Sequence, residues 1–127
     1  MGYDTPEAGT RAAELLRLRA EDDATDSAPL PEWARTLVVS NPLDAPVFIR
    51  FDSTSAPASA LPGTTNGYDV VCPGAALLVF PIKSDVRERQ IIAAVDYPGA
   101  IPAADAGLFC TVTVQEIAAS PSVGPLA

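Results

Sequence analysis

The sequence predicts an all-β fold: a single antiparallel β-sandwich or small barrel of six to seven short strands, preceded by an N-terminal helix and arm. The clearest strand is residues 46–52, where Val47, Ile49 and Phe51 alternate with outward-facing neighbours in the period-two pattern of a half-buried strand. Similar short runs surround this segment, and turn residues separate them. The 13 prolines among 127 residues also disfavour long helices.

Six segments have strand character, and most of them end at a clear turn signal such as Asn41-Pro42 or Pro73-Gly74. In the last segment the apolar residues alternate with threonines, so we expect the apolar ones to point into the core. Between the second and third segments, residues 53–66 are rich in Ser, Thr, Ala and Pro and predict a long exposed loop. The six segments are residues 36–40, 46–52, 68–72, 76–80, 90–95 and 108–116, and the inward residues of the last are Leu108, Cys110, Val112 and Val114.

Residues 5–20 predict an amphipathic helix, with Thr5 as N-cap and Pro6 in the first helical position. A helix of this length is marginal alone, so it must pack against something. The following stretch, residues 21–32, is acidic and contains two prolines, which predicts an extended linker. We therefore expect the helix to dock outside its own domain.

These patterns divide the chain into three parts. Residues 1–35 form the helix and acidic linker arm, residues 36–117 the β-sandwich domain, and residues 118–127 an irregular tail that cannot continue a central strand.

The net charge of −8 makes nucleic acid and anionic membrane surfaces poor partners. No apolar run approaches the ~20 residues that span a bilayer, and the N-terminus carries no basic-then-apolar signal pattern. A soluble protein made in the cytoplasm is the expectation.

The residue types offer no reactive constellation. There is no histidine to act as a base or metal ligand, and the glycines stand singly in turns rather than in a phosphate-binding loop. Cys72 and Cys110 lie in apolar strand patterns, so we expect buried free thiols, with a disulfide as the alternative. The sequence therefore predicts a protein that is not an enzyme, with no cofactor, no metal and no catalytic residue.

The candidate functional residues are apolar or cationic groups suited to protein interfaces. Trp33, the only tryptophan, either seals the core or lies at an interface, and with Tyr68 and Tyr97 it could alternatively form a carbohydrate platform. Arg87 and Arg89, which follow Asp85, lie either in a solvated loop or in the polar rim of an interface. The candidate interface residues are Leu15, Leu16, Leu18, Trp33, Arg50, Arg87 and Arg89.

The order of several short segments over residues 37–115 resembles the small β-sandwich virion proteins of tailed bacteriophages. The segments are VVSNP (residues 38–42), PVFIRF (46–51), YDVVCPG (68–74), VFP (79–81) and TVTV (111–114).

The resemblance implies a non-enzymatic structural protein of the virion, made in the host cytoplasm. It implies a capsid decoration or cement subunit attached through its N-terminal arm and loops, or alternatively a tail or baseplate component. The implied partners are major capsid or tail subunits and further copies in a homo-oligomer or symmetric array, with no nucleic acid and no membrane. A carbohydrate-binding β-sandwich module is the alternative from another functional class.

Overall fold

The structure is a computed structural model, and it describes residues 11–20, 25–52, 62, 67–83, 90–97 and 100–126. These residues form an all-β fold, which confirms the predicted class. The strands are β1 (Ala12–Arg19), β2 (Thr25–Pro29), β3 (Thr36–Asn41), β4 (Val47–Asp52), β5 (Val70–Cys72), β6 (Ala76–Pro81), β7 (Gln90–Val95), β8 (Phe109–Gln115) and β9 (Ser122–Pro125), with one short 3₁₀ helix, η2 (Ala103–Asp105).

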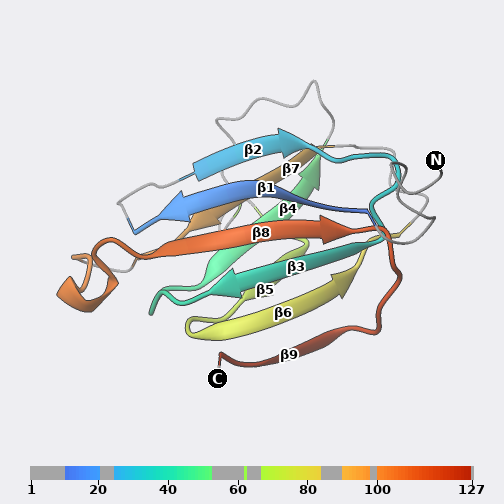
Figure 1. The fold of residues 1–127 in the computed structure, drawn as a ribbon. Helices are drawn as coiled ribbons and strands as arrows, with labels where there is room; N and C mark the ends of the chain where they lie inside the picture. Colours follow the sequence, from blue (N-terminus) through green and yellow to red (C-terminus); the bar gives the residue numbers. More distant parts are fainter. Residues whose placement is uncertain are drawn as a thin grey trace, which may run out of the picture.

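The strands form two antiparallel sheets that share one core (Figure 1). The five-stranded sheet has the order β1-β8-β3-β6-β9, and the four-stranded sheet has the order β2-β7-β4-β5. Side chains from both sheets, among them Leu37, Val112, Ile49 and Ile91, are fully buried between them. This arrangement is that of a β-sandwich.

Strand β4 lies inside the four-stranded sheet, between β7 and β5. Val47 and Ile49 are fully buried, and Phe51 packs partly buried against the core, so the predicted inward face of this strand is confirmed. The β-branched and aromatic side chains of the strand suit a pleated surface with a buried face.

The prediction of an N-terminal helix is wrong over Ala12–Arg19, because these residues form β1 and pair with β8. The pairing register shifts between Glu14 and Leu16, so Leu15 sits at a bulge and the apolar alternation is interrupted there. Beyond the bulge Leu16 and Leu18 point into the core, and the residues between and after them point outward. Residues 5–10 of the expected helix lie outside the described residues.

The predicted linker is also partly wrong, because Thr25–Pro29 form β2 and pair with β7 along the edge of the four-stranded sheet. Leu30 follows and is buried in the core. Residues 21–24 lie outside the described residues. The segment therefore belongs to the sandwich for at least part of its length.

The tail is not wholly irregular, because Ser122–Pro125 form β9 and pair with β6. β9 is an edge strand, the position where a strand can accommodate proline without losing a ladder hydrogen bond. Leu108 was expected to point inward, but it precedes β8 and is 37% exposed.

The two ends of the sandwich can be named after the two ends of β3. The Thr36 end contains the ends of β4, β6 and β8 that carry Asp52, Pro81 and Gln115. The Asn41 end contains the turn from β5 to β6, which passes from one sheet to the other. Each end carries a pocket.

Candidate binding sites

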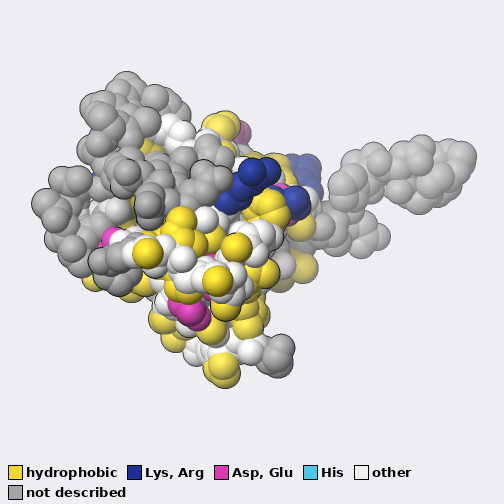
Figure 2. All heavy atoms as spheres, turned by 90° about the vertical axis from the view of Figure 1, so that its left-hand side faces the viewer, with side chains coloured by type: hydrophobic (Ala, Val, Ile, Leu, Met, Phe, Trp, Pro, Cys, Tyr) yellow, Lys and Arg dark blue, Asp and Glu magenta, His cyan; other side chains and the backbone are white. Residues whose placement is uncertain are grey.

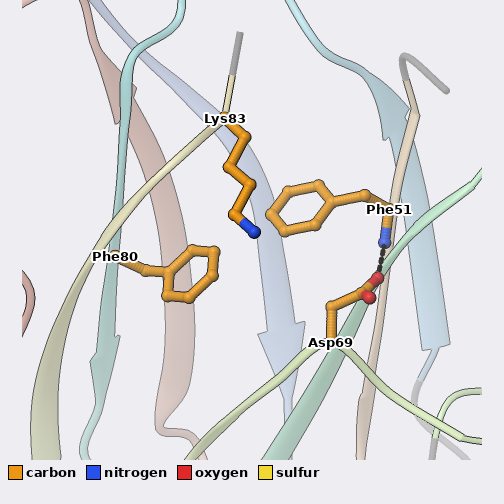
Figure 3. A pocket seen from close by; sticks show the side chains of 4 residues that line it. All are labelled: Phe51, Asp69, Phe80 and Lys83. Carbon is orange, nitrogen blue, oxygen red and sulfur yellow. Dashed lines mark hydrogen bonds between the residues drawn. The ribbon is translucent and has the colours of Figure 1, made fainter. Parts of the chain in front are cut away.

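The first pocket lies between the two sheets near the Thr36 end and has a volume of about 280 Å³. Its apolar walls are Phe51 from β4 and Phe80 from β6, whose rings stack with centroids 6.1 Å apart and planes 17° from parallel. Lys83 and Asp69 complete the lining, and Figure 3 shows the Lys83 side chain extending toward the rings.

One oxygen of Asp69 is already engaged, because its Oδ2 accepts a 2.7 Å hydrogen bond from the backbone N–H of Phe51 (Figure 3). The pocket therefore offers two ring faces, an ammonium group and the remaining carboxylate oxygen. A ligand with an apolar body and a polar end would match these groups. From the sequence, Phe51 is expected in the core, and no binding role is expected for Phe80 or Lys83.

At the Asn41 end, a buried carboxylate organises the turn that precedes β8. Asp105 Oδ2 accepts hydrogen bonds from the Tyr97 hydroxyl at 2.9 Å and from the Asp44 backbone N–H at 2.9 Å. Burial, and then the hydrogen bond to Asp105, raise the pKa of Tyr97 above its ordinary value. Tyr97 therefore stays protonated and keeps donating at neutral pH.

The Asn41 side chain ties two turns together at the same end. Its Nδ2 donates to the carbonyls of Ala45 at 2.9 Å and Pro73 at 3.0 Å, and its Oδ1 accepts from the Leu43 N–H at 3.1 Å. Gly74 lies so close to this turn that a Cβ there would overlap backbone atoms of Leu43 and Asp44. The sequence marked these residues only as turn signals.

The second pocket lies at the Asn41 end of β1 and β8 and has a volume of about 350 Å³. Arg17 and Arg19 of β1 both lie over the ring of Phe109, each with its guanidinium carbon 5.5 Å from the ring centroid. Figure 2, which looks onto this end, shows Lys and Arg side chains gathered beside hydrophobic ones. No local pattern in the sequence indicates a binding role for Arg17, Arg19 or Phe109.

The edge formed by β6 and β9 exposes large apolar side chains. Leu77 is 39% exposed and lies opposite Gly124, whose missing side chain leaves it uncovered. Val123 is 57% exposed on the edge strand itself. Val123 lies opposite the buried Leu78, so it projects from the other face of the sheet than Leu77. The two exposed residues, Leu77 and Val123, together form the β6–β9 edge.

The structure does not gather the predicted interface residues into one site. Leu16 and Leu18, which were expected at an interface, are buried in the core of this chain and are not exposed to a partner in this fold. Leu15 and Trp33 are partly buried and pack against the same core. Arg50 is half-buried in β4 and engages another group of the chain. Arg87 and Arg89 lie outside the described residues.

The three aromatic residues considered for a carbohydrate platform are also dispersed. Trp33 precedes β3 at the Thr36 end, whereas Tyr97 follows β7 at the Asn41 end. Tyr68 is 45% exposed and packs edge-on against Phe48, with ring centroids 4.9 Å apart. Trp33 and Tyr97 therefore cannot stack on one sugar together.

Cys72 and Cys110 are free and buried, as the sequence predicted. Burial raises the pKa of Cys72 to about 11 and that of Cys110 to about 12. Both thiols are therefore protonated at neutral pH and are poor nucleophiles and metal ligands.

Within the described ranges, no group of three or more His, Cys, Asp or Glu side chains is placed to hold a metal ion. In the same part of the chain, no helix has the length and apolar character needed to cross a membrane. Comparisons with family models, with curated proteins and with solved structures find no match for this chain.

Proposed function

We propose that this chain is a non-enzymatic structural protein of a virion, a capsid decoration or cement subunit. The observation that supports the proposal is the β6–β9 edge, where Val123 on the edge strand β9 and Leu77 on the neighbouring strand β6 expose apolar surface. Edge strands with exposed apolar side chains are natural points of attachment for other chains. The resemblance to small β-sandwich virion proteins gives the kind of partner: a capsid subunit, or a tail or baseplate subunit in the rival assignment.

Attachment would bury the β6–β9 edge against the particle, at about 25 cal/mol for each Å² of apolar surface removed from water. Part of this gain is offset by the entropy lost on association. Since Leu16 and Leu18 lie in the core, residues 12–19 contribute to folding rather than to attachment. The net charge of −8 keeps free copies soluble before they bind.

The test is cosedimentation of the purified chain with virions assembled without it. Replacing Leu77 and Val123 together by threonine keeps strand propensity and removes exposed apolar surface, so we expect bound protein to fall at least tenfold. The control is Leu108→Thr, which removes an exposed leucine at the Asn41 end and should leave binding unchanged. Equal binding by the double variant, or failure to detect the chain in purified virions by mass spectrometry, would refute the proposal.

A carbohydrate-binding module is the second candidate, and Tyr68 is the aromatic residue that favours it because the residue is 45% exposed. An exposed ring backed by Phe48 could stack on a sugar face. Glycan-array binding by the wild-type chain, lost in Tyr68→Ala with the far-ultraviolet circular dichroism unchanged, would support this function. An array without signal would exclude it for the glycans tested.

A further inference from the structure

The arginine pair on β1 is held against a single aromatic ring by the strand register. Arg19 lies directly opposite Phe109 in the β1–β8 pair, and Arg17 lies opposite Thr111, one diagonal step away. Both arginines alternate with the buried Leu16 and Leu18, so they project from the outer face of the five-stranded sheet. The ring of Phe109 therefore lies within cation–π distance of two guanidinium groups.

The positive charge of this pair is only partly balanced. Arg17 forms an exposed ion pair with Glu14, with Nη2 3.1 Å from Oε1. Within the described part of the chain, the Arg19 guanidinium makes no hydrogen bond or ion pair and contacts the Phe109 ring. Two cations at one ring repel each other, and an anion placed beside Arg19 would relieve that repulsion. Arginine is also the side chain best shaped to bind a carboxylate in bidentate fashion.

The pocket beside Arg19 supplies an apolar surface next to this charge. It is lined by Arg19, Ala20, Gly107, Leu108 and Phe109, and Leu108 is 37% exposed. Its volume of about 350 Å³ falls in the range of small-ligand pockets.

The wall of the pocket is a fixed turn. Gly107 has φ +84°, a left-handed conformation suited to glycine, and the space where a Cβ would stand is open. The Leu108 N–H donates to the Asp105 carbonyl at 2.9 Å, and the Asp105 carboxylate is itself held by Tyr97 and Asp44. The apolar wall is therefore anchored to the buried polar network.

We propose that this pocket binds a carboxylate carried on an aromatic or branched apolar body. The guanidinium of Arg19 binds the carboxylate, and Leu108 with the Phe109 ring contacts the apolar body. Either a free small acid or the C-terminal residue of a peptide has this chemistry. The inference does not depend on the chain being a virion protein.

The test is an NMR titration of the full chain with N-acetyl-L-phenylalanine, which has both parts of the proposed ligand. We expect shifts in the amide signals of Gly107, Leu108 and Phe109, with a dissociation constant on the order of 1 mM for a ligand of this size. N-acetyl-L-phenylalaninamide, which has the same body without the carboxylate, should bind at least tenfold more weakly.

Arg19→Gln removes the charge from an exposed side chain and should weaken binding of the acid at least tenfold. The matched control is Arg35→Gln, because Arg35 is an exposed arginine at the Thr36 end, bonded to the backbone carbonyls of Glu32 and Ala34. Undisturbed spectra of both variants would establish that they fold.

Equal binding of acid and amide, shifts confined to the Phe51–Phe80 pocket, or no shifts at 20 mM acid would overturn the proposal. Tighter binding of an acetylated tetrapeptide ending in phenylalanine would identify a chain terminus as the ligand, and equal binding would identify a free acid. These outcomes are independent of whether the β6–β9 edge binds virions, so this proposal and the proposed function can fail separately.

Discussion

Replacing Asn41 by alanine should strongly destabilise the fold. The substitution removes hydrogen bonds to the Ala45 and Pro73 carbonyls and to the Leu43 N–H. Leu43 and Ala45 are buried, so two backbone groups would lose their partners away from water, while the carbonyl of the exposed Pro73 can bind water instead. Each buried unpaired group costs about 1–3 kcal/mol, so we expect the free energy of unfolding to fall by about 4 kcal/mol.

Urea unfolding followed by Trp33 fluorescence measures this loss, because the tryptophan packs partly buried against the core. A fall of that size corresponds to a decrease in Tm of roughly 12–20 °C for a chain of this length, with the urea m-value unchanged. Ser40→Ala is the control: Ser40 is the half-buried neighbour of Asn41 on the opposite face of β3, and its change should cost less than about 1 kcal/mol. A loss below about 1 kcal/mol for Asn41→Ala would show that the two turns do not depend on this side chain.

Three further predictions concern the same end of the molecule and the core. Gly74→Ala places a Cβ against the backbone of the turn between β3 and β4, so urea unfolding should show a loss of about 3 kcal/mol or more. Tyr97→Phe removes a hydrogen bond to the Asp105 carboxylate and should cost about 2 kcal/mol by the same measurement; no change would mean that this bond contributes nothing. Folding raises the pKa values of Cys72 and Cys110 from 9.0 to about 11 and about 12, so above pH 9 the unfolded chain loses thiol protons that the folded chain keeps. The free energy of unfolding should therefore fall between pH 9 and 12, by up to about 1.4 kcal/mol per pH unit for each thiol. If the dependence of the free energy of unfolding on pH were the same after both cysteines were replaced by alanine, the two thiols would not be its cause.

The inner strands were predictable because local pattern and burial agree in them. β3, β4, β6 and β7 match the predicted segments to within one residue at either end. Each is a run of β-branched, aromatic or other apolar residues flanked by turn signals, and each pairs on both sides within its sheet. Burial on one face imposes the period-two pattern of β4, whereas β7 is buried at residues 91–95 and is a continuous apolar run.

β1 was mistaken for a helix for two physical reasons. Its residues, AAELLRLR, are strong helix formers. The bulge at Leu15 also allows an extra leucine beside Leu16 and Leu18, and the three leucines together have a spacing that resembles the apolar stripe of a helix. Pairing with β8 and burial of Leu16 and Leu18 override the local preference. The alternation of Leu16, Arg17, Leu18 and Arg19 is the signal that could have identified the strand.

β2 and β9 could not be predicted because they are short edge strands. Their sequences, TDSAP and SVGP, are poor in β-branched residues and contain proline, so they carry no periodic signal of their own. Their pairing is determined by the exposed edges of β7 and β6, which lie far away in the sequence. Such strands depend on tertiary context more than on propensity.

The binding sites depend on contacts that no local pattern records. Arg19 and Phe109 become neighbours only through the β1–β8 register, and Phe51 meets Phe80 only because their sheets face each other. No local sequence pattern singles out Asp105, and its burial becomes visible only with the fold. Residue types therefore limited the possible chemistry, while topology determined which side chains meet.

The positions of the two proposed contact surfaces make them compatible with each other. β1 and β9 are the opposite edges of the five-stranded sheet, so Arg17 and Arg19 lie on one edge and Val123 on the other. A chain attached to a particle through the β6–β9 edge would leave the arginine edge open to a second ligand. The turn held by Asp105 leads into β8, which pairs with β1. That ligand would therefore meet a preformed surface, and little free energy would be lost to ordering on binding. Attachment at one edge and recognition at the other could thus occur in the same molecule at the same time.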